Sequence, residues 1–519
     1  MEIYSVGASF SPIYRNALRR VILLIHQFKS NGYNIVLDVE SGSIHVVDDV
    51  AYEAIHCLNQ ELFLLKTIEN SVNEALEGFG RKGKVLGILR NNLADRYSEV
   101  QLLEVAEEIE KLVESGQLFT SDIADLIDFS NRDESDSKIL KNSGALQVSM
   151  MNGVTGHESV VKALCLHIAH DCNLACKYCF AHEGEYHGKR ELMSIEVGKK
   201  ALDFLIANSG NRRNLEVDFF GGEPLMNWQV VKDIVAYGRE REKLHNKNFR
   251  FTLTTNGVLL DDEIMDFANK EMENVVLSLD GRKEINDKMR PTRNGKGSYD
   301  VVVPKFQEFV KKRGDKEYFI RGTFTRDNLD FVEDIKHFAG LGFDKISIEP
   351  VVAQEENEYA IRKEDLPRIF DQYDQLAKEM VKVYGTEDEF TFFHFLLDLE
   401  GGPCVAKRVS GCGAGTEYMA VTPSGDLYPC HQFVGQEEFL LGNVDKGIVK
   451  PEIPAGFNQC NVYSKEKCKK CFAKYYCSGG CMANSYDFHG DINKVYEIGC
   501  EMERKRVECA IMLKVAELN

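Results

Sequence analysis

Short hydrophobic runs alternate with amphipathic stretches through the middle of the chain. The runs, which are typical of buried strands, lie near residues 164–169, 215–220, 250–255, 274–279, 318–325 and 345–352. Helical patterns separate them at 194–208, 228–242, 261–272, 300–313 and 329–341. Strands that alternate with helices at this spacing predict a parallel sheet with crossover helices. Six repeats favour an open, six-stranded partial barrel over a closed eight-stranded one, so the expected fold class is α/β.

Polar and glycine residues follow the predicted strands in order. The six strand ends carry, in turn, Asp171–Cys179, Gly221–Pro224, Thr255–Gly257, Ser278–Gly281, Arg321 with Thr323, and Glu349–Pro350. In barrels of this kind the chemistry lies at the carboxyl ends of the strands. Turn composition alone does not easily explain four such ends in order, so we expect a ligand site at this rim.

The first 130 residues follow another pattern. Tyr33–Val39 and Ile44–Val47 are strand-like runs joined by a glycine-containing turn, which predicts a hairpin. Helical patterns follow at about 50–69 and 99–114. This order is compatible with a winged-helix-like domain at 26–127, preceded by an extension at 1–25. Residues 128–158 are predicted as a linker, because Asp133–Ser137 has no apolar period.

Charge and hydropathy exclude two kinds of partner. The 519 residues include 63 Lys and Arg against 82 Asp and Glu, a formal net charge of −19. A protein that binds nucleic-acid backbones usually has the opposite sign, so no nucleic-acid partner is expected. No window approaches 18 consecutive apolar residues, so no membrane helix is expected. The apolar run after Arg20 is short and lacks a cleavage site, which argues against a signal peptide.

The 15 cysteines are clustered rather than evenly spread. One group lies at 172–179 and the other at 404–509. A large chain without a secretion signal has little use for a disulfide framework. Clustered thiols in a reducing compartment indicate metal ligands, and a cytoplasmic location is expected.

The first group, Cys172, Cys176 and Cys179, forms a C-x3-C-x2-C motif. Three thiolates can hold three irons of a [4Fe–4S] cluster and leave the fourth iron open to a small molecule. A closed, four-ligand zinc site is the alternative. Three histidines near the motif are also potential zinc ligands, so this alternative is retained: His167, His170 and His182.

Such a motif directly after the first barrel strand resembles that of the radical S-adenosylmethionine (SAM) superfamily, with Tyr178 at the aromatic position beside the third cysteine. The resemblance covers about residues 160–350. It implies that the open iron chelates the amino and carboxylate groups of SAM. It also implies that an electron from the cluster cleaves SAM to a 5′-deoxyadenosyl radical, which abstracts hydrogen. The radical chemistry belongs to the cofactor, which the protein orients and shields.

The same resemblance implies contacts from the strand ends to SAM. Gly221 and Gly222 let backbone carbonyls approach closely, and Glu223 offers an acceptor for the ammonium group. Either Arg290 or Arg321 neutralises the carboxylate by a charge-assisted pair, and the sequence does not choose between them. The remaining candidates are Tyr178, Asn256 for the ribose or sulfonium region, Ser278 for the carboxylate or ribose, and Asp280.

The second cysteine group resembles the SPASM extension of radical SAM enzymes. Its spacing is C-x12-G-x4-C, then, after a gap, C-x2-C-x5-C-x3-C and a last cysteine. The resemblance implies two auxiliary [4Fe–4S] clusters, hence three in the chain. One would be held by Cys468, Cys471, Cys477 and Cys500. The other would be held by Cys412, Cys430 and Cys481, with Cys404 as the candidate fourth ligand. Alternatively, that site stays open and takes a substrate thiolate. Zinc ribbons also use C-x2-C pairs, but with four ligands per metal.

The residue after Cys430 separates branches of this family. In sulfatase-maturating enzymes an Asp stands there as proton acceptor, whereas this chain has His431, which argues against formylglycine formation. His431 is a candidate catalytic base by its intrinsic pKa, or a hydrogen-bond partner of a cluster. Four segments resemble thioether-forming maturases, most closely those of SCIFF (six-cysteine) peptides: Gly411–Gly415, Ala420–Gly435, Tyr475–Cys481 and Ile498–Glu501.

The resemblance therefore implies an oxidoreductase-type enzyme that installs intramolecular thioether crosslinks, from Cys sulfur to carbon, in a ribosomally made Cys-rich precursor peptide. The product would be a sactipeptide or ranthipeptide. One alternative is another SPASM modification: carbon–carbon crosslinking, epimerisation, dehydrogenation or sulfatase-type oxidation. Another is a non-enzymatic iron–sulfur electron carrier.

The expected partners are the precursor peptide with its leader and an electron donor such as ferredoxin or flavodoxin. The resembling maturases carry a small winged-helix domain that recognises the leader, and 26–127 would match it. A strand of the leader could add to the hairpin edge. The rest of the chain divides into the radical SAM partial barrel at 159–355, a helical bridge at 356–403 and the SPASM domain at 404–519.

Overall fold

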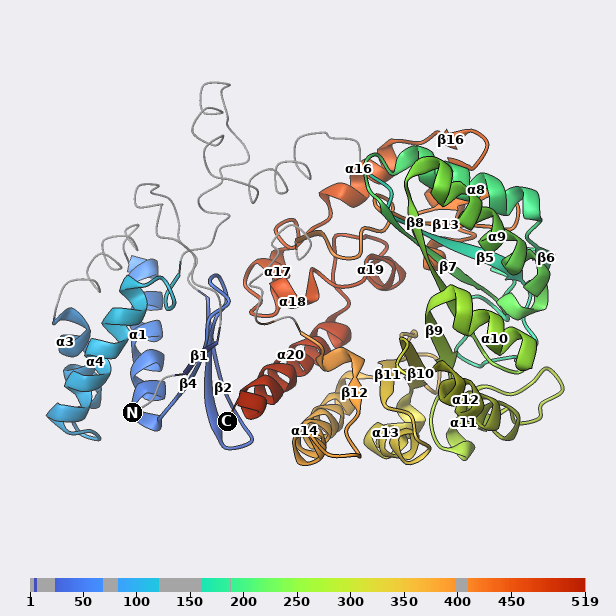
Figure 1. The fold of residues 1–519 in the computed structure, drawn as a ribbon. Coiled ribbons are helices and arrows are strands. Elements are labelled where there is room, and N and C mark those ends of the chain that lie inside the picture. Colours follow the sequence, from blue (N-terminus) through green and yellow to red (C-terminus); the bar gives the residue numbers. More distant parts are fainter. Residues whose placement is uncertain are drawn as a thin grey trace, which may run out of the picture.

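The computed structural model describes residues 4–6, 24–68, 83–120, 160–186, 188–397, 399 and 409–518. These residues form a four-stranded sheet near the amino end and a twelve-stranded sheet that contains the predicted barrel. Figure 1 shows the two parts with the long helix α20 (Glu497–Leu518) between them. The predicted linker at 128–158 lies outside the described residues.

Six neighbouring parallel strands form the barrel in chain order. They are β5 (Ala163–His170), β7 (Asn214–Gly221), β8 (Asn248–Thr255), β9 (Met272–Ser278), β10 (Tyr318–Phe324) and β11 (Lys345–Pro350). The helices between them are α8 (Ile195–Asn208), α9 (Trp228–His245), α10 (Asp262–Glu271), α11 (Lys283–Met289), α12 (Tyr299–Arg313) and α13 (Phe331–Gly340). The α/β partial barrel predicted from the hydrophobic pattern is confirmed.

Local sequence explains where these elements begin and what they bury. Every residue of β5 is buried, as expected for a strand covered on both faces. Ser194 caps α8 by accepting a hydrogen bond from the Val197 N–H, and Asp261 caps α10 in the same way. Phe219 of β7 and Phe251 of β8 stack in the core with their ring centroids 5.5 Å apart.

The barrel sheet continues beyond the six predicted strands on both sides. β12 (Thr391–Phe392) adds in parallel to β11, and β13 (Tyr418–Val421) adds in parallel to β5. From β13 the sheet runs on through antiparallel β14 (Asp426–Tyr428), β15 (Gly442–Asn443) and β16 (Gly447–Ile448). The short β6 (Glu191–Leu192) pairs with the end of β5. The cysteine-rich part is thus joined to the barrel by backbone hydrogen bonds, which the sequence does not indicate.

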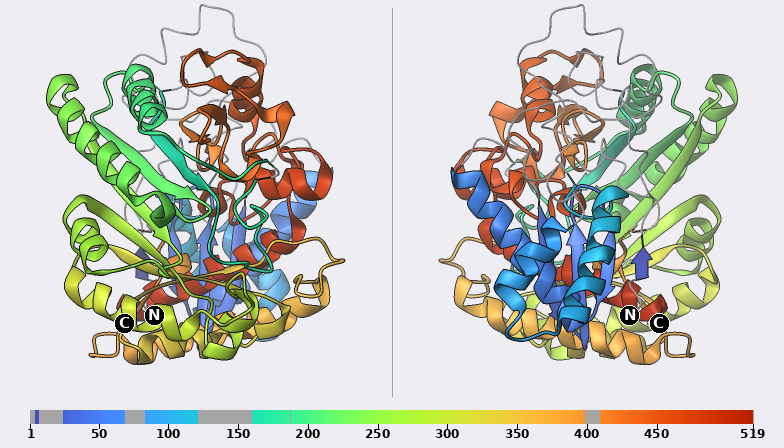
Figure 2. Two further views of the ribbon diagram at one scale, coloured as in Figure 1. Left: turned by 90° about the vertical axis from the view of Figure 1, so that its right-hand side faces the viewer. Right: turned by 90° about the vertical axis from the view of Figure 1, so that its left-hand side faces the viewer.

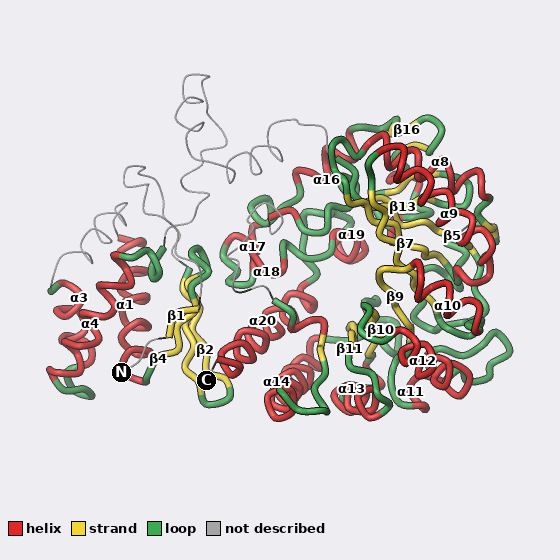
Figure 3. Tube along the Cα trace, viewed as in Figure 1, coloured by secondary structure: helices red, strands yellow, loops and turns green. Residues whose placement is uncertain are grey.

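Short helices and loops make up most of the carboxyl-terminal part, as Figure 3 shows. The helices before α20 are α16 (Glu452–Gln459), α17 (Glu466–Lys469), α18 (Lys474–Cys477) and α19 (Met482–His489). Helix α20 packs along α14 (Leu366–Val383), which lies in the predicted helical bridge. None of the helices in the described ranges combines the length and the apolar character needed to cross a membrane.

The amino-terminal unit, residues 4–6, 24–68 and 83–120, pairs a sheet with helices. Its strands lie in the order β1 (Tyr4–Val6), β4 (Ile44–Val47), β3 (Tyr33–Asp38) and β2 (Ile25–Ser30). Its helices are α1 (Asp49–Ile68), α3 (Lys84–Leu93) and α4 (Glu99–Glu114). The predicted hairpin is present as β3 and β4. Strand β2 and helix α3 are not among the predicted elements.

Part of the predicted extension at 1–25 pairs with the sheet. Residues 4–6 lie antiparallel to β4, and β2 begins at Ile25. A bare sheet edge offers unpaired N–H and C=O groups that an extended segment can satisfy without any hydrophobic pattern. The edge of the hairpin on the β4 side is therefore occupied by the chain itself.

Both faces of this small sheet are buried. Val36 and Val47 pack into the core formed with α1, α3 and α4. Ile35, Leu37 and Ile44, which point the other way, pack into the main core of the molecule. In Figure 1 the sheet lies between its own helices and α20, and the right-hand view of Figure 2 shows those helices on the outer side.

Candidate active site

The first cysteine motif forms a loop that follows β5 and rests on the segment after α11. The N–H groups of Ala175 and Lys177 donate to the carbonyls of Pro291 and Met289, at 2.8 and 2.9 Å. Leu174 and Thr292 form an isolated antiparallel bridge. The loop is therefore held by main-chain bonds on the side away from β5.

Burial dominates the chemistry of these thiols. It is the main cause that raises the pKa of Cys172 to about 12 and of Cys176 to about 11, and neighbouring thiols of the motif contribute to both values. The Leu174 N–H and the Asn256 amide point at the Cys172 sulfur, at 3.5 and 3.6 Å. Adjacent, shielded thiols met by N–H donors fit the ligands of an iron–sulfur cluster, which binds thiolates and is tuned by bonds to sulfur.

Glu223 ties the ends of β7 and β8 together beside the thiols. Its carboxylate accepts hydrogen bonds from the Thr255 hydroxyl at 2.7 Å, the Asn256 N–H at 2.8 Å and the Leu225 N–H at 3.0 Å. Burial raises the pKa of Glu223, and these donors lower it. Glu223 thus positions Asn256, whose side chain contacts Cys172.

Gly221 and Gly222 stand where two strand ends meet too closely for side chains. A Cβ on Gly222 would lie 2.0 Å from the Asp171 carbonyl oxygen. One on Gly221, which has φ of 116°, would lie 2.4 Å from the Ala169 carbonyl oxygen. The glycines therefore allow the loop of the first cysteine motif and the end of β7 to lie close together at the rim.

Tyr178, Asp280 and Arg290 form a buried polar triad at the same rim. The Tyr178 hydroxyl donates to the Asp280 carboxylate at 2.6 Å, and Arg290 donates to the Tyr178 oxygen at 3.0 Å. The Thr323 N–H also donates to Asp280, at 3.1 Å. Burial raises the pKa of Asp280, whereas Arg290 and these donors lower it. The charge of Arg290 also lowers the pKa of Cys176, which links the triad to the loop of the first cysteine motif.

Arg321 differs from Arg290 in being exposed. It lies on β10 opposite Ser278 of β9. The positive charge of Arg321 lowers the pKa of three groups at the rim: Asp280, Glu349 and His431. An exposed guanidinium among the strand ends is available to an anionic ligand, whereas Arg290 already has partners.

Glu349, at the end of β11, begins a half-buried chain of polar contacts that sequence reasoning missed. Its Oε1 lies 3.0 Å from His394 Nε2, and Arg506 of α20 lies 2.9 Å from His394 Nδ1. Arg506 also pairs with Glu503. Burial alone would raise the pKa of Glu349, but His394, Arg321 and Arg506 lower it to about 2. Its place at a strand end marks Glu349 in the sequence, whereas His394 and Arg506 carry no local signal.

His431 borders the barrel mouth. Its ring lies 5.6 Å from that of Phe180, which follows Cys179, and 5.1 Å from that of Phe220, which precedes Gly221. The Tyr418 hydroxyl lies 3.2 Å from its Nδ1. Burial, and next the charge of Arg321, lower the pKa of His431 to about 4, so the imidazole is neutral near pH 7.

The cysteines of the second group gather in two sets. The inner set is Cys468, Cys471, Cys477 and Cys500: burial is the main cause that raises the pKa of Cys468, Cys477 and Cys500, and the nearby Cys471 thiol contributes to each. The outer set is Cys412, Cys430 and Cys481: burial is the main cause that raises the pKa of Cys430 and Cys481, and the nearby Cys412 thiol contributes to both. That each set holds a cluster, as the SPASM resemblance implies, stays a prediction. Cys404 lies outside the described residues.

The two sets differ in their surroundings. In the outer set Cys412 and Cys481 are exposed, whereas in the inner set Cys468 is buried. Arg504 of α20 donates to Cys471 of the inner set. Among the described residues, no three Cys, His, Asp or Glu side chains gather tightly enough to hold a single metal ion. The ligands of a cubane cluster each bind a separate iron and stand further apart.

Tyr186 lies between the first motif and the outer set, and no sequence signal marks it. Burial is the main cause that raises the pKa of its hydroxyl, and thiols from both groups contribute: Cys172, Cys179 and Cys430. The hydroxyl donates a hydrogen bond to the Gly221 carbonyl at 3.2 Å. Two of the histidines considered for zinc are engaged elsewhere: His167 and His170 bond to each other at 3.0 Å and pack on Tyr186.

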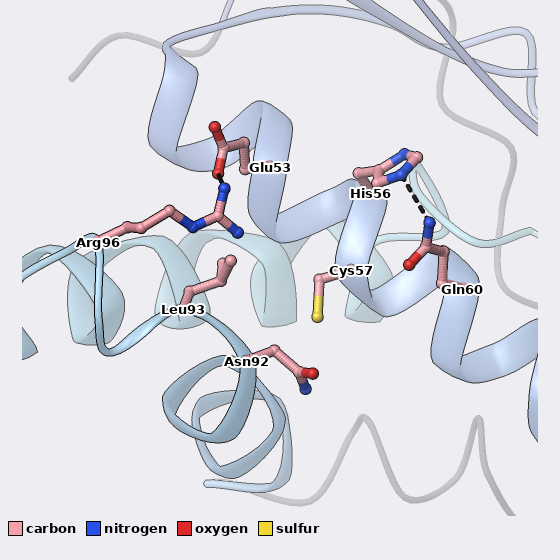
Figure 4. Close-up of a pocket in the computed structure, with 7 residues that line it drawn as sticks. All are labelled: Glu53, His56, Cys57, Gln60, Asn92, Leu93 and Arg96. Atoms are coloured by element: carbon pink, nitrogen blue, oxygen red, sulfur yellow. Dashed lines mark hydrogen bonds and ion pairs between the residues drawn. The ribbon is translucent and has the colours of Figure 1, made fainter.

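A polar cavity of about 350 Å³ lies in the amino-terminal unit, between α1 and the end of α3. Figure 4 shows Cys57 pointing into it, with an ion pair between Glu53 and Arg96 at one side. His56 and Gln60 bond across one turn of α1 at 2.8 Å. Neither thiol set lines this cavity, so it is separate from the rim described above.

Comparison with known proteins identifies the barrel. The model of the Radical SAM superfamily matches residues 166–339. The chain carries a radical SAM domain. The solved structure of native anSMEcpe with bound AdoMet superposes with a TM-score of 0.57 at 23% identity, over 69% of this chain and 99% of that one. The two therefore share the radical SAM fold, as the cysteine motif predicts.

Three relatives by sequence are named as maturases or as a radical SAM enzyme. The mycofactocin maturase MftC of Mycolicibacterium smegmatis is 29% identical over 62% of this chain and 77% of its own length. The radical SAM cyclopropyl synthase TigE of Paramaledivibacter caminithermalis is 22% identical over 66% of this chain and 72% of its own. A cysteine-type anaerobic sulfatase-maturating enzyme of Clostridium novyi is 24% identical over 60% and 86%, respectively.

Replacing Asp280 by Ala tests the buried triad of the radical SAM domain. It leaves the Arg290 guanidinium buried without its carboxylate, so we expect a loss of about 3–5 kcal/mol in unfolding free energy. Urea unfolding of the anaerobic protein measures the change.

The matched control is Glu216→Ala, which removes the carboxylate of an exposed ion pair with Arg250. Its expected cost is about 0–1 kcal/mol. Equal losses in the two variants would contradict the importance assigned to the triad.

Proposed function

We propose that this radical SAM protein installs thioether crosslinks, from Cys sulfur to carbon, within a ribosomally made Cys-rich precursor peptide. One observation carries the proposal: His431, next to Cys430 of the outer thiol set (Cys412, Cys430 and Cys481), packs against Phe180 and Phe220 at the rim that carries the SAM-binding candidates. Two thiols of this set are exposed, so a peptide sulfur can approach both the set and the barrel mouth. The similarity to maturases supports a peptide substrate.

The three thiol sets are the proposed ligands of three [4Fe–4S] clusters. In this proposal the open iron at Cys172, Cys176 and Cys179 binds SAM, which supplies the hydrogen-abstracting radical. Cys404 is the proposed fourth ligand of the outer set, and a substrate thiolate is the alternative. An external one-electron donor such as ferredoxin or flavodoxin reduces the first cluster.

In this proposal, residues at different strand ends bind different groups of SAM. Gly221, Gly222 and Glu223 take the amino group in this proposal. Arg321 takes the carboxylate, because it is exposed at the rim while Arg290 is committed to Tyr178 and Asp280. Asn256, beside Cys172, and Ser278, opposite Arg321, complete the pocket.

Thioether formation removes two hydrogens from the peptide, and each must be assigned. One leaves as a hydrogen atom from the acceptor carbon. The cysteine S–H would give up a proton as its sulfur bonds to that carbon, and an oxidised auxiliary cluster held by the outer set would accept the remaining electron. We assign the proton to His431, which is neutral and lies between Phe180 and Phe220 at the barrel mouth.

Leader recognition is assigned to the amino-terminal unit. A peptide strand adds to a sheet edge through main-chain hydrogen bonds, and on the β4 side that edge holds residues 4–6. The pairing is three residues long, so it is a weak competitor that a longer leader strand displaces.

A crosslinking assay tests the reaction. The anaerobically reconstituted protein with SAM, a reductant and a Cys-rich precursor should yield 5′-deoxyadenosine and a peptide two hydrogens lighter. One thiol of that peptide should resist alkylation. The variant Cys176→Ala should produce neither, and a peptide of unchanged mass or with all thiols free would exclude the proposed chemistry. Carbon–carbon crosslinking, the nearest alternative, gives the same mass but leaves every thiol open to alkylation.

His431→Asn separates proton transfer from SAM cleavage. Asn still accepts a hydrogen bond from Tyr418 but is a poor base, so crosslinking should fall about 10²–10⁴-fold. Formation of 5′-deoxyadenosine should stay within a few-fold. Quantitative mass spectrometry of both products measures the ratio, and parallel loss of the two would contradict a role limited to proton transfer.

Deleting residues 1–6 tests the occupied edge. With β4 exposed, leader peptide should bind more tightly than to the full chain, by about tenfold. Fluorescence anisotropy of a labelled leader measures the affinity. A weaker or unchanged affinity would place the leader elsewhere on the unit.

A further inference from the structure

The amino-terminal unit contacts the carboxyl-terminal part at a segment that separates two proposed cluster ligands. Five residues lie between Cys471 and Cys477 of the inner set. Three of them, Phe472, Lys474 and Tyr475, touch the amino-terminal unit. We call residues 472–476 the ligand spacer.

Glu40, in the turn between β3 and β4, makes the main contact. Its Oε1 lies 2.6 Å from Lys474 Nζ, and both side chains are 0% exposed. Its Oε2 accepts a hydrogen bond from the Tyr475 hydroxyl at 2.8 Å. The Tyr463 hydroxyl lies 2.7 Å from that of Tyr475. Both oxygens of one buried carboxylate are thus used by consecutive residues of the ligand spacer.

The spacer passes this restraint to its cysteines through the main chain. The Lys474 N–H donates to the Cys471 carbonyl at 3.2 Å, and the Cys477 N–H donates to the Ala473 carbonyl at 2.8 Å. Cys477 is the last residue of α18, a helix of only four residues. A helix this short has little stability of its own, so tertiary contacts hold it.

A second contact reaches the other end of the spacer. The His26 ring of β2 stacks on Phe472, which follows Cys471, with centroids 3.5 Å apart and planes 2° from parallel. His26 Nε2 also lies 2.9 Å from Glu508 Oε1 on α20, the helix that carries Cys500. The amino-terminal unit therefore touches both segments that supply the inner set.

We infer that Glu40 is a positioning residue for the inner cluster and that the amino-terminal unit forms part of that cluster site. The inference rests on the proposed assignment of Cys468, Cys471, Cys477 and Cys500 as ligands. Without the Glu40 carboxylate, Lys474 is a buried cation lacking its counter-charge, so the spacer must shift to reach water. That shift displaces Cys471 and Cys477 from the cluster.

The test measures iron rather than catalysis. In a full-length background with Cys172, Cys176 and Cys179 replaced by Ala, only auxiliary clusters can form. Glu40→Gln in this background should lose about four irons per chain, the content of one cluster, after anaerobic reconstitution and gel filtration. The electron paramagnetic resonance signal of one cluster should disappear with them. The control Asp49→Asn removes the carboxylate of an exposed ion pair with Lys29 in the same unit, away from the ligand spacer, and should retain all the iron.

Two further variants separate the possible failures. Cys477→Ala should lose the same cluster, and combining it with Glu40→Gln should cause no additional loss. If Cys477→Ala keeps its iron, the ligand assignment itself is wrong. If Cys477→Ala loses iron and Glu40→Gln does not, the inference about Glu40 is wrong.

A milder variant serves if Glu40→Gln does not fold. Tyr475→Phe keeps both charges and removes one hydrogen bond to Glu40. We expect it to release iron to a chelator about tenfold faster than the parent protein. An unchanged release rate would overturn the inference.

Discussion

The parallel pairing of β13 with β5 sets the geometry of the whole catalytic half. Tyr418–Val421 lie opposite Ala163–Leu166 in unbroken register, so the cysteine-rich part is an extension of the barrel sheet. Backbone pairing fixes two strands about 4.8 Å apart. The outer thiols flanking β13 and β14 are thereby held at a constant distance from the loop after β5. A flexible linker would allow that distance to vary.

Buried or half-buried charges recur wherever separate parts of the chain must meet. Asp280 and Arg290 join a strand end to the segment under the loop of the first cysteine motif, and Glu349 is joined through His394 to Arg506 of α20. Apolar contacts of similar area would hold these parts together as well or better. Ionic contacts differ in that each charged group must meet its partner at one position. They therefore fix how these parts of the chain are placed relative to one another.

The sequence predicts the barrel well because its strands and helices are local patterns. Period and length identify the six strands, whereas the assignment of the cysteines to two sets rests on their spacing and stays a prediction. The joins between parts escape prediction: β13 is four residues long, and β1 is three. Likewise Tyr186, His394 and Arg506 acquire their surroundings only from tertiary packing. The choice between Arg290 and Arg321 needs burial, which residue type does not encode.

The double-sided burial of the amino-terminal sheet limits how such enzymes can be recombined. A domain attached by a linker alone can be exchanged for another without regard to its outer surface. Here Ile35, Leu37 and Ile44 face the main core, so cutting the unit away exposes an apolar surface on both pieces. Replacing this unit by another would therefore require keeping this face and changing only the side that its helices cover.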